Sequence, residues 1–245
     1  MATDQLPPPR DTVTERYGPR VHRAVHHGAF LLLAGALVFV GAMIVAQVGY
    51  GSSYSLKDNF ISDLGAAHCG EFNASGSAGR YVCSPWNAVF DVGIIVMGLC
   101  AVFAVILLRT AFPVRRSRTV GLILLGLMGL GSIGVGFSPE DVNVTVHSIC
   151  ALCAFLGGAL GLMVLGFAMF RDTRWGGFRT YTMVSGLVSF VALVLFLTGT
   201  YAGLGVGGME RLIVAPVLLW SVVVGVHLAR IPTFAPRLLP KSSEP

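Results

Sequence analysis

Charge is scarce in this sequence. Charged residues make up only 12% of its 245 residues and hydrophobic residues 54%, whereas an ordinary soluble domain carries about 25% charged residues. This excludes a soluble fold, because there are too few charged side chains to cover an apolar core. The chain also lacks a phosphate-binding glycine loop, a Cys-x-x-Cys-His haem motif and a serine nucleophile elbow. No cofactor is therefore identified.

Basic residues outnumber acidic ones, 17 to 12, and the pI is about 9.2. A nucleic-acid partner would need these charges gathered on one face or tail. They are dispersed among short loops instead, so we expect no nucleic-acid partner. Arginine outnumbers lysine by fifteen to two, which is typical of a GC-rich bacterial genome.

Six long apolar runs dominate the chain. Each is long enough, at about 1.5 Å per residue in a helix, to cross a hydrocarbon core about 30 Å thick. The runs are continuously apolar rather than alternating, which favours helices over barrel strands. The sequence therefore predicts an all-α fold, a six-span transmembrane helical bundle over residues 28–230. The predicted spans are residues 28–49, 87–108, 119–137, 146–170, 182–202 and 212–229.

The basic residues predict how the bundle is oriented. Lys and Arg near span ends are retained on the cytoplasmic side, and fourteen of the seventeen fall in the two ends of the chain and in the second and fourth loops. The exceptions are Lys57, Arg80 and Arg211. We therefore expect a multi-pass protein of a bacterial plasma membrane with both termini cytoplasmic. Residues 1–27 form a mostly disordered cytoplasmic segment in this prediction, and residues 231–245 a cytoplasmic tail.

Two groups of residues resemble functional motifs but have simpler structural explanations. His22, His26 and His27 precede the first span, where an interfacial helix entry explains them better than a metal cluster, so no metal site is predicted. Glycines recur in the third span, where close helix packing explains them better than phosphate binding. They are Gly126, Gly129, Gly131, Gly134 and Gly136.

The first outer loop, residues 50–86, is the longest in the protein, and its aromatic and branched residues favour a packed structure. Cys69 and Cys83 are the only cysteines outside the spans. A disulfide between them would close a loop of about fifteen residues, worth about 3 kcal/mol in the chain-entropy model. The remaining cysteines lie in apolar runs, where small buried hydrophobes are their expected role. They are Cys100, Cys150 and Cys153.

The second outer loop is short and begins Ser138-Pro139-Glu140-Asp141. Serine, then proline, then an acid three residues after the serine is a helix-start signature, so Glu140 and Asp141 are interpreted as caps of the fourth helix. Alternatively, Glu140, Asn143 and His147 share one helix face and form a polar stripe that descends into the membrane. Functional and structural roles for His147 stay equally open.

Acidic and basic residues also occur at other span ends. Asp91 lies inside the second span, where an ionised carboxylate costs about 2.5–3.5 kcal/mol and should face a partner in the bundle. Alternatively, it stays solvated at the headgroup level. Glu210 and Arg211 are expected at the head of the sixth helix, where capping and snorkelling would explain them. Arg211 is also the predicted counter-ion for one of three carboxylates, those of Asp63, Asp91 and Glu140.

Three short motifs carry a family likeness. The first, after the first span, consists of Asn59 and residues 61–65. The second, before the fourth span, consists of residues 139–141 and His147. The third, before the sixth span, consists of Gly207, Glu210 and Arg211. In this order and placement they resemble the uncharacterised membrane family called domain of unknown function 998, over nearly the whole chain. The resemblance implies a six-span bundle and no established activity.

Two other similarities are weaker. The Ile-Ser-Asp element after the first span is similar to one in the Frag1/DRAM-type membrane proteins. The ceramidase and adiponectin-receptor hydrolases are more distant, because their zinc site needs three histidines and this chain offers only His147 at a suitable place.

The outer polar residues together define one candidate binding site. They are Asn59, Ser62, Asp63, Asp91, Glu140, Asp141, His147, Glu210 and Arg211. The first hypothesis is a site for a lipid headgroup, a small amphiphile or an ion, with membrane lipids as partners. The second is a hydrolase of a lipid-like substrate, with His147 as base and a carboxylate orienting it or a metal; the candidates are Asp63, Asp91 and Glu140. The third is a structural accessory of a larger complex. The substrate and the oligomeric state stay open.

Overall fold

Six long helices form the body of the protein in the computed structural model, which describes residues 19–50, 54–73, 79–170 and 172–230. Each of the six is long and apolar enough to cross a membrane. The predicted all-α, six-span bundle is therefore confirmed, and the chain is a multi-pass membrane protein. Most of the predicted N-terminal segment, and the tail after residue 230, lie outside the described residues. The helices are α2 (Pro19–Val48), α3 (Asn87–Leu107), α4 (Arg116–Phe137), α5 (Val144–Met169), α6 (Gly176–Leu197) and α7 (Gly205–Ala229).

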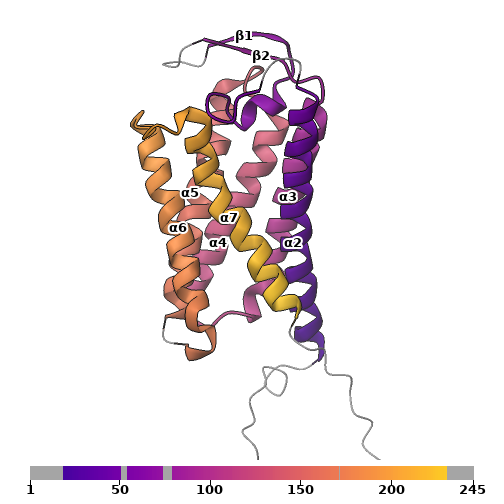
Figure 1. Ribbon diagram of the computed structural model, residues 1–245. Helices are drawn as coiled ribbons and strands as arrows, with labels where there is room; N and C mark the ends of the chain where they lie inside the picture. The colour runs from indigo at the N-terminus through magenta and orange to yellow at the C-terminus, as the bar shows by residue number, and fades with distance from the viewer. Residues whose placement is uncertain (1–18, 51–53, 74–78, 171, 231–245) are drawn as a thin grey trace, which may run out of the picture.

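The helices run up and down in sequence order (Figure 1). Each packs against the next along the chain, α7 returns to pack against α2, and α5 also touches α7 across the ring. The bundle therefore closes on itself. The start of α2 and the end of α7 lie at one end, which we call the far end (Figure 1). Short 3-10 turns follow α3 and precede α6 there: η2 (Leu108–Thr110) and η3 (Thr173–Trp175).

Glycines let neighbouring helices approach closely. A Cβ atom added to Gly98 of α3 or Gly129 of α4 would fall too close to the carbonyl oxygen of the other glycine. Gly131 of α4 likewise faces the backbone of Cys150 and Ala154 in α5. The packing role predicted for the third span is thus confirmed at these positions.

The outer surface of the bundle is apolar, as a lipid environment requires. Phe30, Phe103 and Leu219 are each more than half exposed. Inside, one core cluster at the far end contains Leu165 and Trp220, whose indole N–H donates to Thr182 Oγ1 at 3.0 Å. A second cluster at the opposite end consists of aromatic and aliphatic residues. It contains Phe39, Tyr50, Ile61, Leu64 and Phe90.

The last two helices start earlier than predicted. The structure has Gly176–Leu197 for the predicted 182–202, and Gly205–Ala229 for the predicted 212–229. Positive φ angles between them, at Gly199, Ala202 and Gly203 among others, end α6 and reverse the chain before α7 starts. The prediction that Glu210 and Arg211 stand at the helix head is wrong, because this turn is complete at Gly205 and both lie inside α7.

Candidate functional site

A folded segment covers the end of the bundle opposite the far end (Figure 1). We call it the cap and define it as residues 54–73 and 79–85. It contains the 3-10 turn η1 (Ser62–Gly65) and the antiparallel strands β1 (Gly70–Phe72) and β2 (Arg80–Val82), with Glu71 opposite Tyr81.

Covalent and polar links hold the cap together. Cys69 and Cys83 form a disulfide at the base of the two strands. The hydroxyl of Ser84 donates to the carbonyl oxygen of Leu64 at 2.7 Å. The strands are thereby fixed to η1, and η1 packs against the start of α3.

Asp63 lies at the centre of the cap with no exposed surface. Its carboxylate accepts hydrogen bonds from Asn59 Nδ2 at 2.9 Å and from the Phe60 amide at 3.0 Å. Arg80 Nε donates to both carboxylate oxygens, at 2.9 and 3.0 Å. Burial acts to raise the pKa of Asp63, but the hydrogen bonds and positive charge of Arg80 outweigh it and lower the pKa below the ordinary 3.8. Asp63 is therefore the ionised partner of a buried ion pair.

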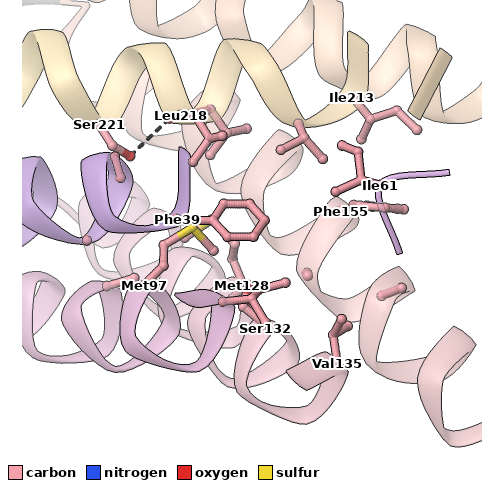
Figure 2. A pocket seen from close by; sticks show the side chains of 18 of the residues that line it. Phe39, Ile61, Met97, Met128, Ser132, Val135, Phe155, Ile213, Leu218 and Ser221 are labelled. Carbon is pink, nitrogen blue, oxygen red and sulfur yellow. Dashed lines mark hydrogen bonds between the residues drawn. The ribbon is translucent and has the colours of Figure 1, made fainter. Parts of the chain in front are cut away.

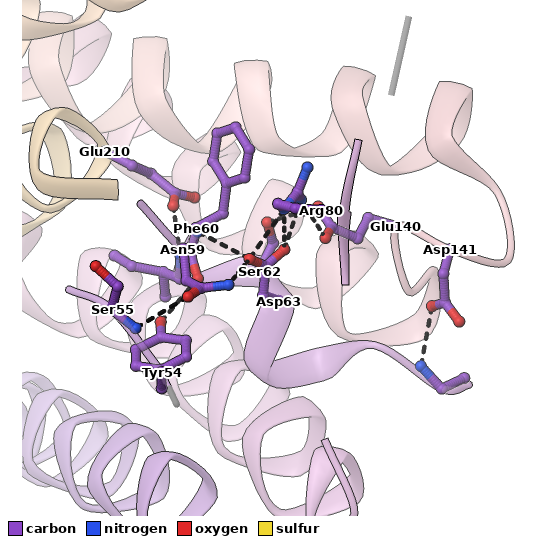
Figure 3. Close-up of polar contacts among 12 residues, drawn as sticks. Tyr54, Ser55, Asn59, Phe60, Ser62, Asp63, Arg80, Glu140, Asp141 and Glu210 are labelled. Carbon is purple, nitrogen blue, oxygen red and sulfur yellow. Dashed lines mark hydrogen bonds and ion pairs between the residues drawn. The ribbon is translucent and has the colours of Figure 1, made fainter. Parts of the chain in front are cut away.

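Arg80 bridges two carboxyl groups from different parts of the chain (Figure 3). Besides binding Asp63, its Nη2 donates to Glu140 Oε1 at 2.8 Å. The guanidinium carbon lies 4.3 Å from the ring centre of Phe60 and 5.2 Å from that of Phe72. These aromatic faces hold the planar cation in place.

Glu140 lies in the turn between α4 and α5 and is 7% exposed. Ser62 Oγ donates to its second carboxylate oxygen at 2.8 Å. Burial and the neighbouring negative charge of Asp63 raise the pKa of Glu140 well above the ordinary 4.5. One cation thus faces two carboxyl groups whose pKa values are shifted in opposite directions, down for Asp63 and up for Glu140.

The predicted helix start at Ser138 is wrong. Residues after Ser138 form a turn, and α5 begins at Val144 with Asn143 as its N-cap, whose side chain accepts from the Val146 amide at 3.1 Å. Neither acid caps the helix, because both are turned toward the cap. Asn143 is exposed while Glu140 and His147 are buried, so the predicted polar stripe does not form either.

Asp141 ties the same turn to the cap. Its carboxylate accepts from the Ala67 amide at 2.9 Å and from the His68 amide at 2.8 Å, and it lies 2.9 Å from His68 Nδ1. Burial acts to raise the pKa of Asp141, but these donors outweigh it and lower the pKa. Asp141 therefore anchors the backbone of the cap as a charged acceptor.

Glu210 reaches the cap from α7. Its Oε2 accepts a short hydrogen bond from the amide of Ile61 (Figure 3). The residue is 7% exposed, and its Oε1 makes no hydrogen bond with any residue that the structure describes. One carboxylate oxygen therefore holds the cap while the other is left without a protein donor.

His147 lies in the first turn of α5 at the same end of the bundle. Its Nδ1 is 2.8 Å from the carbonyl oxygen of Ser138. Because a carbonyl oxygen only accepts, Nδ1 must carry a proton. In the neutral ring, Nε2 is then a hydrogen-bond acceptor.

A cavity of about 90 Å³ lies inside the bundle beneath the cap. Its walls come from five helices, α2, α3, α4, α5 and α7, and are mostly apolar. Figure 2 shows Phe39, Met97 and Met128 among the wall residues, with Ile61 entering from the cap. Three polar residues line it at the cap end: Ser62, His147 and Glu210.

Comparison with known proteins places this architecture in a family. The family model described as "Protein of unknown function (DUF998)" matches residues 21–227. That match covers the cap and all six helices, apart from the first two residues of α2 and the last two of α7. The chain belongs to the DUF998 family. Neither the curated proteins nor the solved structures contain a match to it.

In this DUF998 protein, the three motifs that carried the family likeness meet in space. Ile61 of the first motif binds Glu210 of the third, and Ser62 binds Glu140 of the second. The first and third are joined again where Arg211 Nη1 donates to the Asn59 carbonyl at 2.9 Å. The motifs are thus the contacts that seat the cap on the bundle.

Arg211 has a different role from the predicted one. It makes no ion pair with a carboxylate of the described residues. Instead it binds backbone carbonyl oxygens and the hydroxyl of Tyr54. The carbonyls are those of Leu56 (3.1 Å), Asn59 (2.9 Å) and Gly207 (2.8 Å). Arg211 therefore fixes the first residues of the cap, and the counter-ion prediction is wrong.

Arg80 is the functional residue that sequence reasoning missed. It belongs to no recognisable sequence motif. Its position among the three outer basic residues was the available signal, since a buried carboxylate needs a cation. Asp91 stays outside the cluster: it packs against Gly65 and makes no hydrogen bond or ion pair with the described residues.

Proposed function

We propose that this DUF998 protein binds one small amphiphile in the cavity beneath the cap. The proposal rests on the separation of the cavity wall into an apolar part and a polar end. Apolar side chains surround most of it, and Glu210 and His147, which each have an acceptor atom without a donor among the described residues, line one end. An apolar void does not hold ordered water, which needs two to four polar partners. A molecule with one apolar and one polar part matches both regions.

The cavity volume limits the ligand. An apolar cavity of about 150 Å³ takes up benzene, and this one is about 90 Å³. The enclosed apolar part is therefore short, unless neighbouring helices separate to admit a longer tail. A short-chain amphiphile, or the first carbons of a lipid chain, has the right size.

We further propose that the cap faces the outside of a bacterial plasma membrane and that both termini are cytoplasmic. Most basic residues support this arrangement. Arg109, Arg115, Arg116 and Arg118 lie at the far end, from η2 to the first turn of α4, whereas Lys57, Arg80 and Arg211 are at the cap end. Arginine near span ends is retained in the cytoplasm. The disulfide supports an outer cap, because the outside is oxidising.

This orientation is testable with a membrane-impermeant maleimide. Cys100, Cys150 and Cys153 are first replaced by alanine, and Lys57→Cys or Arg116→Cys is then introduced. We expect intact cells to label Lys57→Cys only, and opened cells to label both. Labelling of Arg116→Cys alone in intact cells would reverse the topology.

Binding is favoured over hydrolysis by the environment of His147. A general base is usually oriented by a carboxylate, but His147 Nδ1 is held by a backbone carbonyl. Asp63 and Glu140 are engaged with Arg80. The polar groups near the cavity are thus arranged to hold the cap and to accept hydrogen bonds.

A photoreactive short-chain diazirine alcohol tests cavity binding. Purified protein in lipid nanodiscs is labelled with and without excess 1-hexanol, and the labelled residues are mapped by mass spectrometry. We expect saturable labelling at wall residues such as Met97 and Met128. Lipid-facing positions should label without saturation.

Two leucine substitutions on α5 provide the matched pair. Ala151→Leu fills part of the cavity, because Ala151 lines it, whereas Cys153 is exposed on the outer side of the same helix. Saturable labelling should disappear in Ala151→Leu and persist in Cys153→Leu. If the wild type shows none, the cavity is not a ligand site and the structural-accessory hypothesis gains support.

A further inference from the structure

The hydroxyl groups that line the cavity all donate their protons to the protein itself. Ser62 Oγ donates to Glu140 at 2.8 Å. Ser132 Oγ donates to the Met128 carbonyl and Ser221 Oγ to the Val217 carbonyl, each at 2.9 Å. These serines can therefore only accept a hydrogen bond from a ligand.

The two ionisable residues of the wall also present acceptors. The proton of neutral His147 is held on Nδ1 by Ser138, which leaves the Nε2 lone pair. Glu210 uses Oε2 for the Ile61 amide and keeps Oε1 free of any donor in the described part of the chain. With Glu210 ionised, the polar end of the cavity is rich in lone pairs and poor in available protons.

None of the Lys or Arg residues that the structure describes lines the cavity, so these residues bring no positive charge to its wall. The guanidinium groups of Arg80 and Arg211 at this end of the bundle are bound to other groups: Arg80 to Asp63 and Glu140, and Arg211 to carbonyl oxygens and Tyr54. A phosphate or carboxylate headgroup would find neither a cation nor a free donor, and burying an unpaired charge is strongly unfavourable.

We propose that the ligand is a primary amine amphiphile, bound as an alkylammonium with its nitrogen at Glu210 Oε1 and the His147 and Ser62 acceptors. This rests on the proposed function and specifies its ligand class. An ammonium group carries three N–H donors and the charge that a buried carboxylate needs. An alcohol of the same length brings one donor and no charge, and it should bind more weakly.

Three probes of equal chain length test the ligand class: hexylammonium chloride, 1-hexanol and sodium hexanoate. Each competes with the diazirine alcohol for cavity labelling in the wild-type protein. Only the labelling that is lost in Ala151→Leu is counted as cavity labelling. Labelling that results from partitioning into lipid is thereby left out. We expect hexylammonium to halve labelling at a concentration at least about tenfold below that of hexanol. Hexanoate should not compete.

Glu210→Gln identifies the group responsible. Glutamine retains a carbonyl oxygen for the Ile61 amide but removes the negative charge. The advantage of hexylammonium over hexanol should fall by about tenfold or more.

The outcomes separate the two proposals. If hexanol or hexanoate competes as well as hexylammonium, the cavity binds amphiphiles without selecting amines, and only the ligand class is wrong. An unchanged amine preference in Glu210→Gln overturns the assigned role of Glu210. If none of the three competes and labelling is not saturable, the proposed function fails as well.

Discussion

Arg80 and Glu140, sixty residues apart in sequence, are joined by a 2.8 Å hydrogen bond between Nη2 and Oε1. This contact links the strands of the cap to the turn between α4 and α5. Since the same guanidinium also binds Asp63, one arginine connects the interior of the cap to the membrane bundle. Stability of the cap should therefore depend strongly on this single cation.

Arg80→Met leaves the buried carboxylate of Asp63 without its cation. Breaking a buried ion pair on one side costs about 3–5 kcal/mol, so thermal unfolding of the purified protein should occur at a clearly lower temperature. Arg115→Met, at an exposed position, is the matched control. Adding Asp63→Asn to Arg80→Met should restore part of the loss, because the unpaired charge is gone. If the double variant unfolds at a lower temperature than Arg80→Met, Arg80 acts through packing alone.

The opposite pKa directions of Asp63 and Glu140 predict a stability maximum in pH. The lowered pKa of Asp63 means that its stabilisation is present above the ordinary pKa of 3.8 and is lost as the pH falls through the lower folded value. The raised pKa of Glu140 has the reverse effect: its stabilisation is present below 4.5 and is lost as the pH rises through the raised value.

Glu140→Gln tests this assignment, because glutamine imitates the protonated carboxyl at every pH. Unfolding temperatures measured across a pH series should show a flatter alkaline side than the wild type, with an unchanged acid side. An identical alkaline slope in both proteins would mean that Glu140 carries no raised pKa.

Reduction of the Cys69–Cys83 disulfide should loosen the cap. The cysteines are 14 residues apart, and closing a loop of about fifteen residues is worth about 3 kcal/mol in the chain-entropy model. We expect faster proteolysis of the cap after reduction and little change in the helices. A form in which Cys100, Cys150 and Cys153 are alanine isolates this bond. Equal proteolysis of oxidised and reduced protein would show that the polar contacts alone hold the cap.

Gly129→Ala and Gly126→Ala separate close packing from helix propensity. Both glycines lie on α4, but a Cβ at Gly129 would meet the carbonyl of Gly98, whereas one at Gly126 would make an ordinary 3.7 Å contact with Val105. Overpacking costs about 1–3 kcal/mol, so Gly129→Ala should lower the unfolding temperature. Gly126→Ala should leave it unchanged or raise it. Equal effects would contradict the close approach of α3 and α4.

The sequence by itself determined the six helices. Runs of apolar residues long enough to cross a membrane must satisfy their backbone hydrogen bonds internally, and a helix does this without any partner. That requirement is local, so composition and length were sufficient. The motif around Asn59–Leu64 was similarly recognisable, because a conformation with many side-chain to backbone bonds needs particular residue types in a fixed order.

The choice of ion-pair partner was decided only by the tertiary structure. From the sequence, Arg211 was the predicted counter-ion because it lies near an outer span end, as the acidic residues do. The folded cap instead brings Arg80 within 2.9 Å of Asp63 and 2.8 Å of Glu140, while Arg211 binds carbonyl oxygens. Such pairing depends on distances of a few ångströms between segments 17 and 60 residues apart. The cavity, likewise, exists only where the side chains of five helices fail to meet.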